Sequence, residues 1–238
     1  ETFDVAATPS CWTNTGVENW LFTTSATYGA GSTEHTGNSG YYAWVDDSEP
    51  SNVGTTLTSP LIDITGLTNP RLRFYLWSNS TISTLDTLIV QAFDGTSWVT
   101  LDSISQSLGA QWQEMNYYLS SLAASTIQVR FIINENSAGS YQHDVSIDDI
   151  YVESGPTCPE PSNLTPTGMT TTGTSLGWTE NGNATQWSVE YGPQGFSPGT
   201  GTFVSVTTTP ATTLSGLAAG TSYEFYVRAI CSATDSSA

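Results

Sequence analysis

The sequence predicts an all-β protein, and three observations lead to this fold class. Aromatic residues make up 11% of the 238 residues, and Thr is abundant; aromatic and β-branched residues favour strands. Lys and Arg together number four and Met two, so residues that favour helices are scarce. Several segments alternate apolar and polar residues with a period of two, the pattern of half-buried strands. A helical bundle is therefore excluded, and an α/β enzyme is disfavoured.

The clearest alternation lies in residues 71–77 and 127–133. The core-facing positions are Leu72, Phe74 and Leu76 in the first segment and Ile127, Val129, Phe131 and Ile133 in the second. The opposite positions are Arg73, Tyr75 and Trp77 in the first segment and Gln128, Arg130 and Ile132 in the second. The segment 87–93 is apolar at both parities, which predicts a central strand.

The segment 145–152 breaks the alternation in an informative way. Val145 and Ile147 share one parity, whereas Ile150 and Val152 share the other. All four reach the core only if the strand contains one extra residue, which is a β-bulge. The sequence therefore predicts a bulge at Asp148-Asp149 that redirects both carboxylates.

A domain boundary is predicted near residue 154. Residues 153–161 contain three Pro and one Gly, which a central strand does not tolerate. We therefore expect two domains, 1–154 and 155–238. The second domain shows the alternation of a β-sandwich again, but the sequence ends soon after the segment 223–229, so we expect its last strand to be missing.

Residues 1–153 resemble a MAM domain, an extracellular β-sandwich module. The matching segments are Thr2-Phe3-Asp4, Glu34-His35-Thr36-Gly37-Asn38-Ser39-Gly40-Tyr41-Tyr42, Leu57-Thr58-Ser59-Pro60, Leu72-Arg73-Phe74-Tyr75 and Val145-Ser146-Ile147-Asp148-Asp149-Ile150-Tyr151-Val152. The resemblance implies a jelly-roll sandwich. Two features depart from the family pattern: Glu34 stands where an Asp is usual, and Cys11 is the only cysteine where the family usually has two disulfides.

Residues 158–238 resemble a fibronectin type III domain, an immunoglobulin-like β-sandwich. The matching segments are Cys158-Pro159-Glu160-Pro161, Ser175-Leu176-Gly177-Trp178, Trp187-Ser188-Val189-Glu190-Tyr191 and Leu217-Ala218-Ala219-Gly220-Thr221-Ser222-Tyr223. The combination is similar to secreted multidomain proteins of Bacteroidetes-type bacteria. In such proteins these modules often flank a catalytic or adhesive region.

The three cysteines suggest one disulfide. Cys158 opens the second domain and Cys231 follows its segment 223–229, so a bridge between them would close a long loop and stabilise a small sandwich. Two free thiols are the alternative. A bridge implies an oxidising compartment, and we expect a secreted or cell-surface protein. Cys11 is left over, and we expect it to be buried.

The charge balance excludes two classes of partner. The formal net charge is −18 and the sequence pI is about 4.1. Phosphate backbones would repel such a chain, so nucleic acid is not an expected partner. Anionic membrane surfaces are disfavoured for the same reason, and no apolar run is long enough for membrane insertion.

Acidic residues suggest a structural calcium site in the first domain. If the N-terminal segment lies beside the strand 145–152, the carboxylates gather and repel, and few cations are present to pair with them. Oxygen ligands favour Ca²⁺, and the resemblance to MAM domains also implies such an ion. The candidate ligands are Asp4, Glu34, Asp46, Asp148 and Asp149. Solvated acids that cap turns are the alternative.

A ligand-binding face is predicted opposite the core side of the segment 71–77. It would contain Arg73, Tyr75 and Trp77, and Arg130 from another strand would join them. Aromatic rings stack on the apolar faces of sugars, and Arg binds carboxylate or sulfate in a forked geometry. The alternative is that loops cover this side of the strand and that the aromatic residues are core.

The metalloprotease motif HExxH and glycine-rich phosphate loops are absent from the sequence. We therefore expect a non-catalytic binding or accessory region of a larger secreted or surface protein, with a polysaccharide as ligand. Protein–protein adhesion or self-association is one alternative. Accessory domains of a secreted protease or glycosidase are another.

Overall fold

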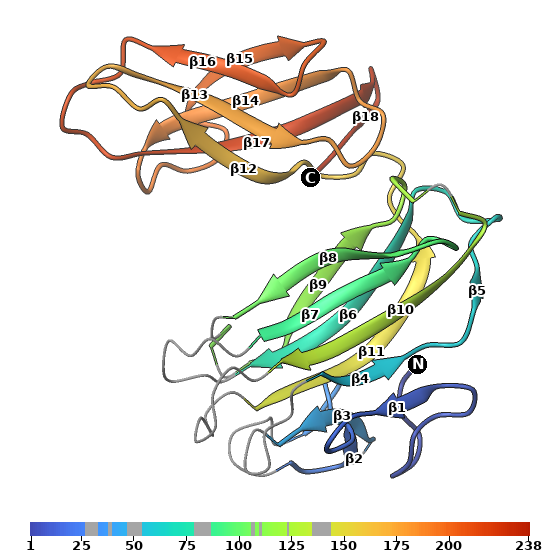
Figure 1. The fold of residues 1–238 in the computed structure, drawn as a ribbon. Helices are drawn as coiled ribbons and strands as arrows, with labels where there is room; N and C mark the ends of the chain where they lie inside the picture. The colour runs from blue at the N-terminus through green and yellow to red at the C-terminus, as the bar shows by residue number, and fades with distance from the viewer. Residues whose placement is uncertain are drawn as a thin grey trace. The chain divides into compact units, whose positions relative to one another are not determined.

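The computed structural model describes residues 1–26, 33–37, 40–46, 54–78, 87–105, 108–109, 111–122, 124–134 and 144–238. These residues form eighteen strands and no helix (Figure 1), so the all-β prediction is confirmed. No helix that could cross a membrane occurs in the described part of the chain. The chain divides into two units, Glu1–Ser154 and Gly155–Ala238.

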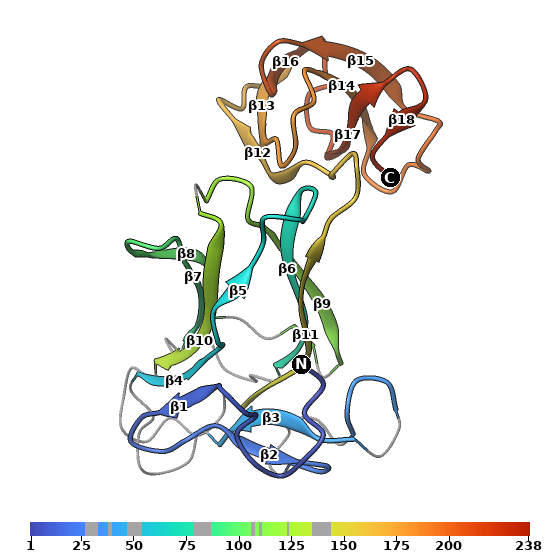
Figure 2. The ribbon, with the colours of Figure 1, turned by 90° about the vertical axis from the view of Figure 1, so that its right-hand side faces the viewer.

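The first unit contains two antiparallel sheets (Figure 2). The first sheet has the order β1-β4-β10-β7-β8, with β5 paired to β10. Its strands are β1 (Thr13–Thr15), β4 (Thr55–Thr58), β5 (Ile62–Asp63), β7 (Thr87–Phe93), β8 (Trp98–Ile104) and β10 (Thr126–Asn134). The second sheet has the order β2-β3-β11-β6-β9. Its strands are β2 (Leu21–Thr23), β3 (Tyr42–Val45), β6 (Pro70–Ser78), β9 (Gln113–Tyr118) and β11 (Val145–Ser154).

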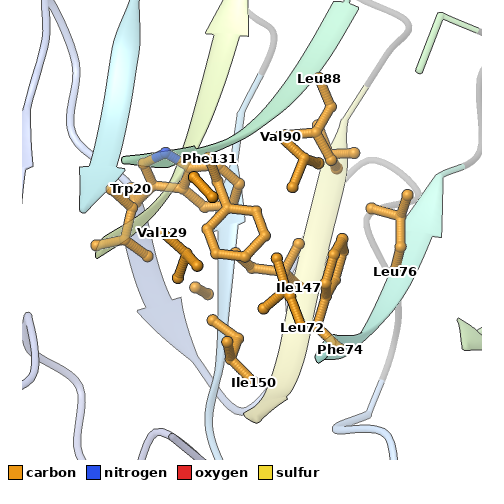
Figure 3. Close-up of a cluster of buried hydrophobic side chains, with 14 of the residues drawn as sticks. Trp20, Leu72, Phe74, Leu76, Leu88, Val90, Val129, Phe131, Ile147 and Ile150 are labelled. Carbon is orange, nitrogen blue, oxygen red and sulfur yellow. The ribbon is translucent and has the colours of Figure 1, made fainter. Parts of the chain in front are cut away.

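The hydrophobic core lies between these two sheets (Figure 3). Phe131 of β10 is fully buried, and its ring centroid lies 4.9 Å from that of Phe74 on β6. Trp20 adds a third ring, 6.5 Å from Phe131. The core-facing positions predicted from the alternation of β6 and β10 are all buried. Burial of these apolar side chains is the main force that holds the two sheets together.

The predicted bulge in β11 is present. The pairing of β11 with β6 shifts register between Asp148 and Tyr151, and Asp149 has a φ of 49°. Ile147 and Ile150 are both buried on either side of the shift. The backbone N–H of Ile150 donates to the carbonyl of Glu1 over 2.9 Å, so the N-terminal segment lies beside β11, as the calcium hypothesis assumes.

The second unit also contains two sheets. The three-stranded sheet has the order β12-β13-β16 and the four-stranded sheet the order β15-β14-β17-β18. The strands are β12 (Ser162–Thr167), β13 (Gly173–Thr179), β14 (Gln186–Pro193), β15 (Thr202–Thr207), β16 (Ala211–Ser215), β17 (Tyr223–Ser232) and β18 (Asp235–Ser236). Where we expected the last strand to be missing, the structure has the two-residue strand β18. A tight turn after β17 lets the chain reverse within a few residues, and β18 pairs with β17.

Two contacts fix the strand β17 in the second unit. Cys158 and Cys231 form a disulfide, as the sequence suggested. The hydroxyl of Tyr223 accepts the backbone N–H of Ala218 over 3.1 Å, which is the arrangement of a tyrosine corner. The third cysteine, Cys11, is exposed and free. The expectation that it is buried is wrong because Cys11 lies in the turn before β1, with a φ of 66°, and not on a core-facing strand position.

Candidate functional site

The bulge in β11 places two carboxylates next to His35. Asp148 accepts the backbone N–H of His35 over 3.0 Å and that of Asp149 over 2.8 Å. Asp149 Oδ2 lies 2.8 Å from His35 Nδ1. Both oxygens of Glu34 accept bonds from Thr36. The buried acids of this corner therefore have protein donors.

Burial dominates the electrostatics of this corner. Burial raises the pKa of Asp148 to about 6, and the negative charges of Asp149 and Glu34 act in the same direction. The two backbone N–H groups bonded to Asp148 oppose this shift. The negative charges of Glu34 and Asp149 therefore act on Asp148.

The other two candidate ligands are Asp4 and Asp46. Asp4 is exposed, and its Oδ1 accepts the hydroxyl of Thr2 over 3.2 Å. Asp46 follows β3 and is half-buried, and its neighbour Asp47 lies outside the described residues. No three His, Cys, Asp or Glu side chains of the described residues are grouped so that they could hold a metal ion. The calcium ion therefore stays a prediction.

Calcium removal tests that prediction. If an ion bridges these carboxylates, chelation by EGTA will lower the melting temperature of the first unit, and added Ca²⁺ will restore it by mass action. The melting of the second unit serves as the internal control. A melting curve that does not change in either direction contradicts the calcium site.

The outward side of β6 is partly covered by other side chains, and Tyr75 and Trp77 are half-buried. The ring of His35 stacks on Tyr75 with 3.3 Å between centroids. Trp77 packs edge-on against Trp112 at 5.8 Å, and Tyr42 beside them is fully buried. Residues 33–37 and the aromatic cluster thus occupy the surface that the sequence assigned to a ligand.

The arginines on this side of β6 are also engaged. Arg73 and Arg71 both bond to Glu153, at 2.8 and 2.7 Å. The guanidinium of Arg73 lies over the ring of Tyr151, 4.5 Å from its centroid. The hydrogen bond from Arg73 is the main reason why the pKa of Glu153 lies below its ordinary value. We call the outward positions Arg71, Arg73, Tyr75, Trp77, Tyr151 and Glu153 the Tyr75 face.

Arg130 does not join the Tyr75 face. It lies on β10 in the first sheet, whereas Arg73, Tyr75 and Trp77 lie on β6 in the second sheet. The outward sides of two packed sheets point in opposite directions, as the edge-on view of the sandwich shows (Figure 2). The predicted grouping is corrected on this point because periodicity tells which side of a strand is outward but not to which sheet the strand belongs.

Arg130 is instead held in a small cluster on the outward side of the first sheet. Its guanidinium lies over the ring of Trp98, 3.9 Å from the centroid, and its Nε donates to Gln91 Oε1 over 2.7 Å. Gln91 Nε2 donates in turn to Thr100 Oγ1 over 2.9 Å. Phe93 packs against Trp98 with 5.3 Å between centroids. We call these five residues the Arg130 face.

The strand register explains why the Arg130 face forms. Gln91 on β7 is opposite both Arg130 on β10 and Thr100 on β8, and Phe93 is opposite Trp98. Side chains on opposed positions of adjacent strands contact one another on one side of the sheet. Sequence reasoning missed Trp98, Phe93, Gln91 and Thr100. The alternation of residues 98–101 could have indicated which of them face outward. It could not have indicated that β8 pairs with β7, because that pairing is a long-range contact.

The second unit has a hollow of about 360 Å³ on its surface. It is lined by Thr165, Thr167, Ser175, Leu176, Gly177, Ala211, Thr212 and Thr213. None of these residues is charged or aromatic. The Arg130 face, which combines a cation, two aromatic rings and an amide, is therefore the stronger candidate.

Three solved structures illustrate what the chain is similar to. The K2 cleaved adhesin domain of Lys-gingipain is 18% identical, with 65% of this chain and 97% of that chain covered and a TM-score of 0.45. The fibronectin type III domain of human collagen alpha-1(XX) is 32% identical over 35% of this chain and 81% of that chain, with a TM-score of 0.30. The carbohydrate-binding module TmCBM61, solved with β-1,4-galactotriose, is 12% identical over 61% and 90%, with a TM-score of 0.42.

Comparison with curated proteins found no match. Family models, in contrast, match almost the whole chain. The model of the MAM domain, meprin/A5/mu, matches residues 2–159, and the model of the fibronectin type III domain matches residues 159–238. The resemblance inferred from the sequence motifs is thereby confirmed. The chain belongs to the MAM domain family, and a fibronectin type III domain follows its MAM domain.

Proposed function

We propose that the first unit is a non-catalytic module that binds polysaccharide on its Arg130 face, within a secreted or cell-surface protein. MAM and fibronectin type III domains are generally non-catalytic and typically extracellular. The Cys158–Cys231 disulfide is consistent with that location. The chain thus serves as a binding or accessory region of a larger protein.

The composition of the Arg130 face is the observation that carries this proposal. Trp98, Phe93 and Arg130 present flat, partly exposed side chains, and Gln91 and Thr100 add an amide and a hydroxyl beside them. Flat rings contact the C–H surface of a sugar, whereas amide and hydroxyl groups bond its hydroxyls. The cross-strand bonds hold these groups in place before a ligand arrives, which reduces the entropy lost on binding.

The Tyr75 face supports the proposal less well. Its aromatic residues are occupied by His35 and Trp112, and its two arginines already bond to Glu153. A ligand would therefore have to displace protein contacts there. On the Arg130 face the cation stacks on Trp98 and bonds only to a neutral amide among the described residues, so a ligand would not have to break an ion pair of those residues there.

A protein partner or self-association, the alternative left open by the sequence, has less support. The three most exposed apolar side chains of the described residues, Val17, Leu61 and Met169, come from separate connections between strands. Phe203 on β15 and Tyr226 on β17 are less exposed and lie on either side of Glu190 in the second unit. Single exposed apolar residues are common on monomeric proteins and do not mark an interface. A binding face made of cross-strand contacts is the more specific feature.

Replacing Trp98 with Ala tests the proposed face. We expect the variant to lose about tenfold or more of its affinity for whichever polysaccharide retains the parent protein, because a central aromatic contact is removed. Affinity electrophoresis against a panel of neutral and acidic polysaccharides measures this loss. Circular dichroism confirms that the variant is folded.

Tyr151→Ala is the matched control, since Tyr151 is a partly exposed aromatic residue of the Tyr75 face. We expect its retardation to equal that of the parent. Loss of binding in Tyr151→Ala with full binding in Trp98→Ala would place the ligand on the opposite sheet and overturn the proposal. No retardation of the parent on any polysaccharide would remove the function itself.

A further inference from the structure

The four arginines of this acidic chain differ in the charge that surrounds them. Arg71 and Arg73 share Glu153 as their ion-pair partner. Arg228 on β17 is exposed and has no ion pair within the described residues. Arg130 likewise has no carboxylate partner there, but it is held by Gln91 and Trp98. Arg130 is therefore a fixed cation whose charge is not neutralised by an acid of the described chain.

The guanidinium of Arg130 keeps most of its donors for a ligand. A guanidinium carries five N–H groups, and Arg130 gives the one on Nε to Gln91. The four N–H groups on its two Nη atoms donate to none of the described residues. Burial lowers the pKa of Arg130 from its ordinary value, which means that the protein holds this charge at some cost. A carboxylate placed against the Nη atoms would offset that cost through two parallel hydrogen bonds.

The outward positions next to Arg130 on β10 and β7 are neutral, and Asp63 on β5 lies further along β10, opposite Thr126. The outward positions of its own strand are Thr126, Gln128, Ile132 and Asn134, and those of the adjacent β7 are Thr87, Ile89, Gln91 and Phe93. None of these residues is charged, whereas the whole chain has a net charge of −18. A single carboxylate of a ligand would therefore be attracted to Arg130. Further carboxylates on either side of it would find no cation at these positions and would be repelled by the negative net charge of the protein.

We infer that the Arg130 face selects sparsely acidic glycans, in which single carboxylate-bearing sugars are separated by neutral sugars. This inference rests on the proposed polysaccharide function and names the class of ligand for the same face. The carboxylate binds the Nη atoms of Arg130, and the neutral sugars lie along Trp98, Phe93, Gln91 and Thr100. A polymer with a carboxylate on every sugar is disfavoured by repulsion that acts over about 10 Å at 0.1 M salt.

Matched pairs of polysaccharides test this inference. Glucuronoxylan and xanthan serve as sparsely acidic probes, each beside its carboxyl-reduced form, and polygalacturonate serves as a densely acidic probe. We expect the parent to bind at least one native sparse glycan about five- to tenfold more tightly than its reduced form, the effect of one partly exposed charge-assisted pair. Polygalacturonate is expected to bind more weakly than that glycan.

Three variants assign the preference to Arg130. Arg130→Gln is expected to bind the native and reduced forms equally. Arg130→Lys keeps the positive charge but loses the forked N–H donors of the guanidinium and its stacking on Trp98. This variant is therefore expected to retain only part of the preference for the native glycan over its reduced form. Arg228→Gln, which removes an exposed arginine from the second unit, is expected to behave like the parent. Thermal melting confirms that each variant is folded.

The outcomes separate this inference from the function on which it rests. Equal binding of native and reduced glycans by the parent overturns the inference and leaves polysaccharide binding intact. A preference that survives in Arg130→Gln, or tightest binding to polygalacturonate, also overturns it. Absence of binding to every probe and to every neutral polysaccharide overturns the proposed function as well.

Discussion

Replacing both Cys158 and Cys231 with Ser is expected to destabilise the second unit by about 3–4 kcal/mol, because the disulfide closes a loop with a sequence separation of 73. The bridge joins the segment before β12 to the end of β17, and these strands belong to different sheets of the sandwich. For a unit of this size the loss lowers the melting temperature by about 15 °C. Differential scanning calorimetry measures the shift.

The first unit and the third cysteine provide the controls for this experiment. Cys11 is free and exposed, so Cys11→Ser is expected to leave both transitions in place. Reduction of the parent protein should reproduce the shift of the double variant. If the double variant lowers the free energy of unfolding of the second unit by less than about 1 kcal/mol, the core around Trp178 and Trp187 stabilises the sandwich without the disulfide.

Replacing Phe131 with Ala is expected to destabilise the first unit by about 3–5 kcal/mol. Phe131 is fully buried and contacts Phe74 of the opposite sheet and Trp20 (Figure 3). Truncation removes this contact across the sandwich and leaves a cavity between the sheets. The melting temperature of the first unit is expected to fall by about 10 °C, as followed by calorimetry.

The second unit and the variant Ile132→Ala are the two controls for Phe131→Ala. The transition of the second unit should stay in place, because Phe131 belongs to the core of the first unit. Ile132→Ala changes the neighbouring, outward-facing position of β10 and should have a smaller effect. Equal losses in Phe131→Ala and Ile132→Ala would contradict the assignment of the two sides of β10.

Strand faces and the bulge could be predicted from the sequence because both depend on local alternation. Leu72, Phe74 and Leu76 are buried and their neighbours are not, since a period of two fixes the side of each residue. The parity change in β11 predicted the bulge for the same reason, and the register shift at Asp148 bears it out. The Cys158–Cys231 disulfide could likewise be predicted, because only one of the three cysteines lies outside the second unit.

The candidate site could not be predicted to the same extent because it depends on long-range pairing. Arg130 and Tyr75 are both outward positions of alternating strands, but they belong to different sheets. His35 covers Tyr75 from a part of the chain far away in sequence. Trp98 meets Arg130 only because β7 lies between β8 and β10. None of these contacts has a signal in local periodicity.

We expect the ligand to contact the outward side of the first sheet at Trp98. The most direct test is the indole N–H resonance of Trp98, assigned with Trp98→Phe, during titration of the full chain with oligosaccharides from the polysaccharide that binds. We expect this resonance to shift, while those of Trp178 and Trp187 in the second unit stay in place. A titration in which Trp77 and Trp112 shift and Trp98 does not would contradict the claim.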